Sequence, residues 1–422
     1  AGSGIARAQM EEFARRYGAA DSAVLVWSMG ITQHAHGTDN VAAIVNLALA
    51  RGNVGRRGAG LMPIRGHSGV QGGAEMGAYA TAFPGGTNID DASAANLAEA
   101  YGFPIGGSPG LRAEEMLAAA GRNELAVLWS SGGNFLEVMP DPAGVEAAMR
   151  RVPLRIHQDI IVSGQMLVDP ADAGAVLLLP AATRYEQSGG GTETTTERRV
   201  AFGPEVRGPR IGEARSEWEI FGDVARRVDP ERADLATFAS GEEIRAEIAR
   251  VVPTYAGVEG LTKIGDSVQW GGTRLCEGGK FPTPDGRARF TVVAPPTDEI
   301  PDDGRFRLST RRGRQFNTMV FAERDPITGA ERDAVFLADA DAARLGVRDG
   351  DAVVLVSDHG EMPGRVHLAP MAPGNVQVLF PEGNVLLPGG RTEAASGIPD
   401  YTTRVAIRPI ESTAEASGRL RT

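Results

Sequence analysis

The first half of the chain alternates between helical and strand-like hydrophobic patterns. Apolar residues recur at helical spacing over residues 5–17, and a short apolar run follows at residues 24–27. Asp39 and Asn40 then precede a helical pattern over residues 41–50, which stops at Gly52. A strand, a loop and a helix in this order are typical of an α/β protein.

Three later apolar runs predict strands over residues 125–129, 153–156 and 175–179, and helical patterns precede them at 92–101 and 113–120. Continuous apolar strands separated by helices indicate a parallel sheet that is covered on both faces. Such a sheet binds ligands beyond the carboxyl ends of its strands. Small and polar residues follow two of these strands, namely Gly132, Gly133, Asn134, Gln158 and Asp159.

The middle of the chain is less regular. Residues 185–199 follow neither period and predict an extended loop, whereas residues 217–227 predict an amphipathic helix. From residue 228 to 304 the pattern is mixed, with a strand signal at 288–292. The prolines at 295–296 mark a candidate domain boundary.

Short strand-like runs dominate from residue 305 onward. Turn signals separate the predicted strands, which are 305–309, 352–356, 365–368, 376–380 and 404–407. One short helix over residues 339–345 is predicted to end at Gly346. Strands this closely spaced predict a small barrel of roughly 110 residues. The predicted fold class is therefore α/β, with Rossmann-like parallel-sheet domains followed by a C-terminal β-barrel.

Composition excludes several classes of function. The 422 residues carry a net charge of -11, which disfavours nucleic acid as a partner. No apolar run approaches the roughly 18 residues of a membrane span. A single cysteine, Cys276, excludes an internal disulfide framework and any multi-cysteine metal site within the chain. The first residue is Ala1, and we expect a processed chain or part of a longer protein.

Two glycine-rich loops, residues 28–37 and 58–77, flank the helix predicted at 41–50. They are dense in Gly, Gln, His and Ser, and the second loop contains Arg65. Small and polar residues bury too little apolar area to offset the entropy lost on ordering the chain. These loops therefore predict close binding of a polar ligand.

Several runs of residues resemble one enzyme family. The runs 29–34, 52–55 and 63–72, together with Asn46 and Leu47, resemble the molybdopterin oxidoreductases, in particular their formate dehydrogenase alpha-subunit-like branch. The runs 312–319, 325–329, 381–384 and 399–401 resemble the family's molybdopterin-dinucleotide-binding barrel. The resemblance extends from about Gly4 to about Pro409.

The resemblance implies four consecutive segments. Residues 1–66 are the C-terminal part of an α/β molybdopterin-binding domain, and residues 67–215 are a second α/β domain. Residues 216–300 are a mixed connecting region, and residues 301–422 are the β-barrel that caps the cofactor.

The resemblance also implies a cofactor and site residues. Family members hold molybdenum or tungsten through bis-molybdopterin guanine dinucleotide, and Arg65 occupies the position of an arginine that faces the substrate carboxylate. His67 and His34 are candidates to assist proton movement, although His67 stands where many formate dehydrogenases have Gln. The expected cofactor-binding residues in the α/β part are Met29, Gly30, Gln33, Gly132, Gly133, Asn134, Gln158 and Asp159. Those in the barrel are Arg311, Arg312, Gln315, Asn317, Thr318, Asn384 and Tyr401.

One part of the family pattern is missing. Family members place the metal-ligating Cys, selenocysteine or Ser, and the cysteines of a 4Fe-4S cluster, before the segment that is matched here. We therefore expect no metal ligand within this chain, and Cys276 lies far from the ligand's expected position. Without the resemblance, His34 would be interpreted as a loop or helix-cap residue, and Arg65 as a surface charge.

The expected function is a cytoplasmic oxidoreductase catalytic subunit acting on a small anionic substrate, which is formate by family resemblance. An electron-transfer subunit is a candidate partner. A non-catalytic cofactor-binding or scaffold subunit is the alternative. An ordinary nucleotide-binding enzyme would need a Gly-x-Gly-x-x-Gly turn or a Walker motif, and the sequence has neither.

Overall fold

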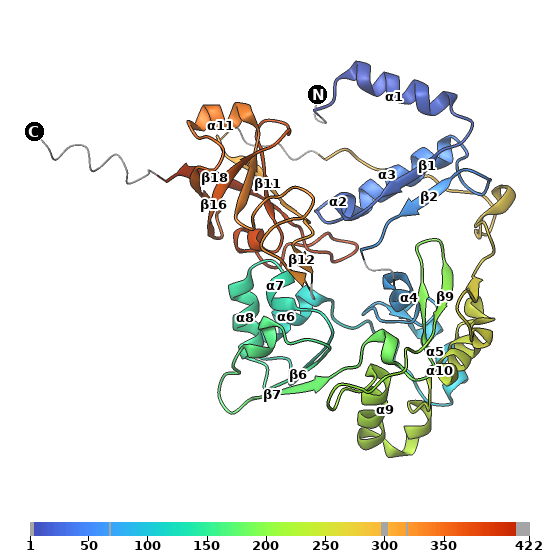
Figure 1. Cartoon of the computed structure of the whole chain (residues 1–422). Coiled ribbons are helices and arrows are strands. Elements are labelled where there is room, and N and C mark those ends of the chain that lie inside the picture. The colour runs from blue at the N-terminus through green and yellow to red at the C-terminus, as the bar shows by residue number, and fades with distance from the viewer. Residues whose placement is uncertain (1–3, 67–68, 297–302, 318–319, 411–422) are drawn as a thin grey trace, which may run out of the picture. The chain divides into compact units, whose positions relative to one another are not determined.

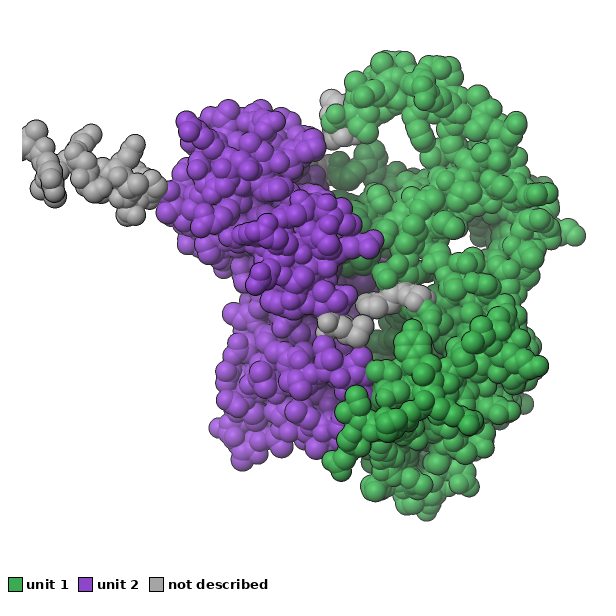
Figure 2. All heavy atoms as spheres, in the orientation of Figure 1, with its two compact units in different colours: residues 1–110, 182–296 green, residues 111–181, 297–422 purple. Residues whose placement is uncertain are grey.

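The computed structural model describes residues 4–66, 69–296, 303–317 and 320–410. It divides into two compact units, shown in different colours in Figure 2. Unit 1 comprises residues 1–110 and 182–296, and unit 2 comprises residues 111–181 and 297–422. The units thus interleave along the chain, whereas the four predicted segments are consecutive, and those segment boundaries stay a prediction.

Unit 1 begins with a small parallel sheet and its helices (Figure 1). The elements in order are α1 (Arg7–Ala19), β1 (Val24–Trp27), α2 (Met29–Thr32), α3 (Gly37–Ala50) and β2 (Gly60–Pro63). Strand β1 pairs in parallel with β2, with Val24 opposite Gly60. The predicted strand at 24–27 is confirmed, but the predicted helix start is late, because α3 begins at Gly37 and already contains Asp39 in its first turn.

The rest of unit 1 contains short helices and an antiparallel sheet. Its helices and strands are α4 (Val70–Glu75), β3 (Ala82–Phe83), β4 (Thr87–Asn88), α5 (Asp91–Tyr101), β8 (Gly191–Thr194), β9 (Arg199–Gly203), α9 (Glu217–Val228), α10 (Gly241–Val251) and β10 (Ser267–Gln269). Short 3-10 turns connect them at Arg184–Glu186, Pro230–Leu235, Pro253–Tyr255, Val258–Gly260 and Glu277–Gly279. The three-stranded sheet has the order β10-β9-β8.

Two sequence predictions in unit 1 are wrong. The expected loop at 185–199 contains strand β8 and reaches β9, because Val200 of β9 is buried against Val252, Tyr255 and Val258 far along the chain. The strand expected at 288–292 does not form in the described chain. Its backbone is instead held at Thr291, which exchanges two hydrogen bonds with the Asn46 side chain, at 2.7 and 3.0 Å.

The first part of unit 2 is a parallel three-stranded sheet with helices. Its elements are α6 (Ala113–Gly121), β5 (Val127–Ser131), α7 (Phe135–Val138), α8 (Pro142–Arg150), β6 (Leu154–Asp159), a 3-10 turn at Gly164–Leu167, and β7 (Ala175–Pro180). The strand order is β5-β6-β7, and the predicted parallel pairing is confirmed. Cover on both faces is incomplete, because Leu177 and Leu178 of β7 are nearly half exposed.

The second part of unit 2 is a closed six-stranded barrel, as predicted. Its order is β11-β17-β14-β16-β15-β18. The strands are β11 (Phe306–Arg311), β14 (Ala334–Leu337), β15 (Ala352–Val356), β16 (Glu361–Leu368), β17 (Asn375–Leu379) and β18 (Thr402–Pro409). A small hairpin, β12 (Phe316–Asn317) with β13 (Val320–Phe321), the helix α11 (Asp339–Leu345) and a 3-10 turn at Glu382–Leu386 complete this part.

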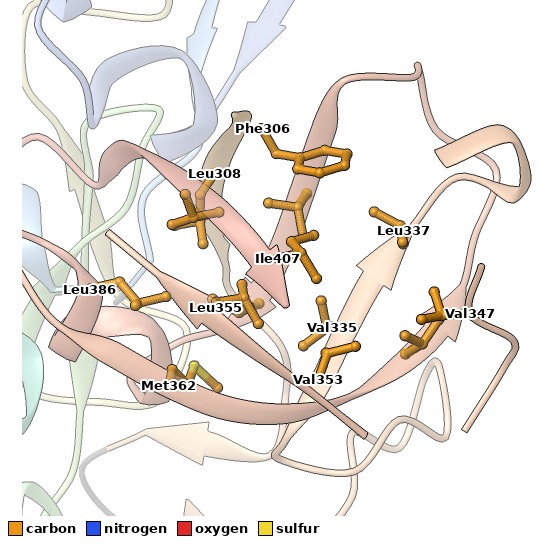
Figure 3. Close-up of a cluster of buried hydrophobic side chains, with 14 of the residues drawn as sticks. Phe306, Leu308, Val335, Leu337, Val347, Val353, Leu355, Met362, Leu386 and Ile407 are labelled. Atoms are coloured by element: carbon orange, nitrogen blue, oxygen red, sulfur yellow. The ribbon is translucent and has the colours of Figure 1, made fainter. Parts of the chain in front are cut away.

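Among the described residues, the barrel interior forms the largest cluster of buried apolar side chains (Figure 3). Leu308, Val353 and Leu355 have no exposed surface. Strand β14, which the sequence did not predict, is buried at all four positions and therefore lacks the alternation that marks a strand. Gly346 ends α11 at φ +71°, a conformation that glycine adopts without strain.

Among the residues that the structure describes, no helix is both long and apolar enough to cross a bilayer.

We expect Leu355→Ala to lower the free energy of unfolding by about 2–5 kcal/mol, because it removes a fully buried side chain from a closed core. Hydrogen–deuterium exchange of peptides from β15 and β16 should locate the loss in the barrel. Leu167, which is 72% exposed in the same unit, provides the matched control. Equal effects of Leu355→Ala and Leu167→Ala would contradict the assignment of this core.

Candidate functional site

Parallel pairing of β1 and β2 brings the two glycine-rich loops of unit 1 together. The Ile64 backbone N–H donates to the Trp27 carbonyl at 2.7 Å, and the Ser28 hydroxyl donates to the Ile64 carbonyl at 3.0 Å. A Cβ on Gly66 would lie 3.7 Å from Cε of Met29. The two loops therefore lie side by side at the carboxyl ends of the strands, as the sequence analysis expected.

Arg65 lies at this edge with an exposed side chain. Within the described chain, no hydrogen bond or ion pair engages its guanidinium. An arginine in this state can bind a carboxylate through two parallel N–H donors. His67 and Thr318 were also predicted as site residues, and both lie outside the described residues.

The imidazole of His34 is held by its own chain. Its Nδ1 accepts the backbone N–H of His36 at 3.1 Å, and its Nε2 lies 2.8 Å from the side-chain amide of Asn40. Asn40 also donates to the Ile31 carbonyl at 3.0 Å. These bonds join the end of α2 to α3 and give His34 a structural role, and its role in proton movement stays a hypothesis.

Two other predicted residues belong to the same turn of chain. Gly30 lies within α2, and a Cβ added to it would meet nothing within 4 Å. Gln33 is the C-cap residue of α2. The α2 turn thus leaves open backbone next to the Met29 side chain.

A polar cluster, in which Tyr255 and Thr194 are buried and Glu75 is partly buried, fixes α4, the helix that follows the Arg65 loop. Gln71 donates to the Glu75 carboxylate at 2.8 Å and the Trp270 indole N–H donates to it at 3.1 Å. The Tyr255 hydroxyl also bonds to Glu75 and lies 2.9 Å from the Thr194 hydroxyl. Burial, followed by the hydrogen bond to Glu75, raises the pKa of Tyr255. The sequence offered no period or motif by which these partners could be found.

In unit 2, the predicted residues at the ends of β5 and β6 lie next to one another. Gly132 and Gly133 adopt φ of +70° and +78°, and no atom would lie within 4 Å of a Cβ on either. The Gly132 N–H donates to the Gln158 carbonyl at 2.8 Å. Asn134 caps α7, and its side chain accepts the backbone N–H of Glu137 at 3.3 Å. The Asp159 carboxylate accepts a hydrogen bond from the backbone N–H of Ile160 at 2.7 Å.

Gln165 holds this glycine turn and was not predicted. It is 1% exposed, donates to the Gly133 carbonyl at 2.8 Å and accepts the Phe135 N–H at 2.9 Å. The residue stands alone in an irregular stretch of sequence, so neither pattern nor spacing marks it.

His157 is a second buried residue that the prediction missed. It is 2% exposed, and neither ring nitrogen bonds to another described residue. Burial, with a smaller contribution from the nearby Arg155, lowers the pKa of His157 to about 4. Arg155 is fully buried and donates to the carbonyls of Gln165, at 3.0 Å, and Val168.

The predicted barrel residues that the structure describes make hydrogen bonds or ring contacts within unit 2. The Asn384 amide donates to the Glu137 carbonyl at 2.9 Å, and the Tyr401 hydroxyl donates to the Val138 carbonyl at 2.8 Å. These two bonds tie the barrel to α7, directly after the glycine turn. The Arg312 guanidinium lies 3.3 Å from the centre of the Phe380 ring.

Burial lowers the pKa of Arg312 and raises that of Tyr401, and the two groups oppose each other's shift. Gln315 donates to the Phe380 carbonyl at 3.0 Å. The remaining two predicted residues are Arg311, which lies over the Phe336 ring, and Asn317, which accepts the Val320 N–H.

Three buried amide side chains are only partly satisfied. The oxygens of Gln158, Gln315 and Asn384 accept no hydrogen bond from other described residues, although each nitrogen donates one. Within the described ranges, no three His, Cys, Asp or Glu side chains are grouped so that they could hold a metal ion.

Two family models match the chain. The model "Molybdopterin oxidoreductase" matches residues 5–227, and the model "Molydopterin dinucleotide binding domain" matches residues 306–415. The first match contains both loop edges described above, and the second contains the barrel.

Curated relatives are similar over most of this chain. F420-dependent formate dehydrogenase subunit alpha of Methanocaldococcus jannaschii is 31% identical over 378 residues, which are 86% of this chain and 54% of that protein. Protein YdeP of Escherichia coli is 29% identical over 94% of this chain and 54% of its own length. An uncharacterized oxidoreductase of Mycobacterium tuberculosis is 30% identical over 98% of this chain and 54% of its own length. The chain spans about half the length of these relatives.

A solved structure supports the fold. Acetylene hydratase from Pelobacter acetylenicus superposes with a TM-score of 0.64 over 96% of this chain and 63% of that protein, at 13% sequence identity. At this identity the similarity concerns the fold alone.

Because the folded state keeps His157 neutral, the free energy of unfolding should decrease as the pH is lowered from about 6.5 to about 4. In that window the unfolded chain binds a proton that the folded chain rejects, at a total cost of about 3 kcal/mol. We expect His157→Leu to remove this part of the pH dependence of the free energy of unfolding, measured by urea titration. Above pH 7, the free energy of unfolding should depend on pH in the same way in the variant and the parent. If both lose the same free energy of unfolding between pH 6.5 and pH 4, His157 is not the group responsible.

Proposed function

The chain belongs to the molybdopterin oxidoreductase family, and from this premise we propose that it forms the carboxy-terminal part of a catalytic subunit. The proposed activity is the two-electron oxidation or reduction of a small anionic substrate at a molybdenum or tungsten centre. The single observation that carries the substrate class is Arg65, which is exposed beside the Met29 loop without a partner among the described residues.

The residues of unit 2 fit one nucleotide end of the expected cofactor, bis-molybdopterin guanine dinucleotide. Gly132 and Gly133 form a turn where no side chain limits the approach of a ligand to the backbone. Asp159 supplies carboxylate oxygens, which can accept both the ring N–H and the exocyclic amine of guanine. Gln158 precedes Asp159 in β6, and its buried side-chain oxygen has no donor among the described residues. The buried Gln165 keeps the turn in place.

When bound, the metal centre and its pterins supply the two-electron chemistry. The contribution of this chain is binding and positioning. Arg65 would bind and orient the anionic group of the substrate, and the Met29 turn would approach the cofactor. The hydrogen-bonded cluster around Glu75 limits movement of the chain that follows Arg65.

Formate is the substrate that we propose, and the similarity to F420-dependent formate dehydrogenase subunit alpha supports it. Formate offers one carboxylate and little else to recognise, so a single forked donor such as Arg65 suits it. The alternative, a non-catalytic cofactor-binding or scaffold subunit, predicts protein without bound metal. Metal analysis of the purified full-length protein separates the two.

Arg65→Ala should lower kcat/KM for formate by about 10²–10³-fold, because it removes a positioned charge from the substrate site. The molybdenum or tungsten content should stay nearly unchanged. Arg57→Ala, at an exposed arginine of the same unit, is the control and should leave both quantities as they are. Unchanged turnover in the Arg65 variant would refute the proposed role.

Asp159→Asn should weaken retention of the guanine dinucleotide by about tenfold to a hundredfold, because it replaces a charged acceptor by an amide. The measurement is the nucleotide released from protein that has been dialysed and then denatured. Asp169→Asn changes an exposed aspartate of the same unit and should retain the parent's content. Equal retention in both variants would remove Asp159 from the proposed site.

A further inference from the structure

Unit 1 contains a cavity of about 490 Å³ among β8, β9, α9 and α10 (Figure 1). None of the residues proposed above for the substrate or the cofactor lines it. Its walls carry the arginine Arg245 and the aromatic side chains of Tyr185, Trp218 and Phe221. Cavities of about 300–1,000 Å³ are typical of small-molecule sites, so this cavity has the size of a separate ligand site.

Arg245 of α10 is a buried cation without a counter-charge. Its side chain is 3% exposed, and the two hydrogen bonds that it makes to described residues both come from Nη1. They go to the backbone carbonyls of Gly189, at 3.1 Å, and Gly190, at 3.4 Å. Within the described part of the chain, Arg245 forms no ion pair and its Nε has no acceptor. Because charged groups are rarely buried unless they are paired, this guanidinium is poised to bind an anion.

The other charges of the cavity wall do not neutralise Arg245. Arg184 and Glu193 form an ion pair with each other. Glu217 lies in the first turn of α9, where the helix dipole stabilises a carboxylate. Burial lowers the pKa of Arg245, and the charge of the exposed Glu242 opposes this shift only in part. One positive charge therefore remains uncompensated at the wall.

The rest of the wall describes the body of a ligand. Tyr185 and Phe221 are 60% and 43% exposed, and the aliphatic side chains of Ile244 and Ile248 lie on the same wall. The indole N–H of Trp218 is buried and has no acceptor among the described residues. Aromatic side chains pack well against a flat apolar group, and the indole is a further hydrogen-bond donor. The walls thus suit a flat apolar molecule that carries hydrogen-bond acceptors.

We propose that this cavity binds a monocarboxylate with an aromatic body. The carboxylate bonds to the guanidinium of Arg245, and the aromatic ring lies against Tyr185, Trp218 and Phe221. One carboxylate supplies the single negative charge that the walls lack. Inorganic phosphate has no apolar surface to bury and fits the aromatic wall less well. The inference does not rest on the proposed function, because none of these residues belongs to the proposed substrate and cofactor sites.

A purely structural role is the alternative for Arg245. Its Nη1 closes the Gly189–Gly190 turn, and its guanidinium lies 4.9 Å from the centre of the Phe202 ring. Neither contact supplies a negative charge. A structural role therefore predicts no preference of the cavity for an anion.

Isothermal titration calorimetry of the purified full-length protein tests the proposal with three probes. Benzoate has the charge and the ring, benzamide has the shape without the charge, and acetate has the charge without the ring. We expect benzoate to bind at least about tenfold more tightly than either, because only benzoate uses both the guanidinium and the aromatic wall. Absence of benzoate binding, or equal affinities for benzoate and benzamide, would overturn the proposal.

Substitutions assign the binding to the cavity. Arg245→Met should weaken benzoate binding by about tenfold to a hundredfold, because it removes a charged donor. Arg207→Met, at an exposed arginine of the same unit outside the cavity, should bind benzoate as the parent does. Arg65→Ala should also bind it unchanged. Loss of benzoate binding in the Arg65 variant would assign the anion to the proposed substrate site and would overturn the proposal.

Two milder variants decide the matter if circular dichroism shows that Arg245→Met does not fold. Trp218→Phe keeps a ring and removes the N–H, and it should weaken benzoate binding by about fivefold. Phe221→Ala removes a partly exposed ring, which should spare the fold, and it should weaken binding by about tenfold. Unchanged affinity in both variants would overturn the proposal.

The calorimetric readout requires no bound metal, cofactor or turnover. A failure of the proposed enzymatic function, seen as metal-free protein, would therefore leave the binding results interpretable.

Discussion

Parallel pairing of neighbouring strands is the constraint on which both candidate sites depend. In a parallel pair, the segments that leave the two strands emerge at the same edge. The pairing of β1 with β2 places the Met29 turn beside Arg65, and the pairing of β5 with β6 places Gly132 beside Gln158. Antiparallel pairing of the same strands would send these loops to opposite ends of the sheet. The glycine-rich loops thus owe their proximity mainly to the main-chain bonds of the paired strands.

Polar side chains from distant parts of the sequence then hold those loops in place. Gln165 bridges both sides of the Gly133 turn, and the Glu75 carboxylate joins α4 to Tyr255 and Trp270. A buried polar group without a partner costs about 1–3 kcal/mol, so the buried Gln165 in particular favours the one arrangement of the chain that satisfies it. Glycine-rich loops that are held in this way can stay open to a ligand and still be well positioned.

The sequence predicted those elements whose burial differs from one face to the other. The strand at 352–356 and the helix at 339–345 have the predicted bounds, because their apolar positions follow one period and glycine follows the helix. Strand β14 has no polar face, and β8 and β9 form because Val200 packs against residues more than fifty positions away. The apolar alternation at 288–292 has no matching core, since Val292 is 97% exposed.

The residues of the candidate site were predicted from the family resemblance. That they lie close together was predicted from the rule that ligands bind at the carboxyl ends of parallel strands. Neither could show that the His34 ring is bound by His36 and Asn40, because that depends on the exact path of the chain between α2 and α3. The partners of the loops, Gln165 and Glu75, are single polar residues without a periodic context. Only the packed structure distinguishes such residues from solvated ones.

The closed barrel has a consequence for the behaviour of the protein in concentrated solution. Each of its six strands is paired on both sides, so the barrel presents no free row of backbone donors and acceptors to another molecule. Intermolecular strand exchange, the first step toward ordered aggregates, is therefore disfavoured at these six strands while the barrel stays folded. At high protein concentration, the six barrel strands should therefore not pair with strands of other molecules, whatever the other surfaces of the protein bind.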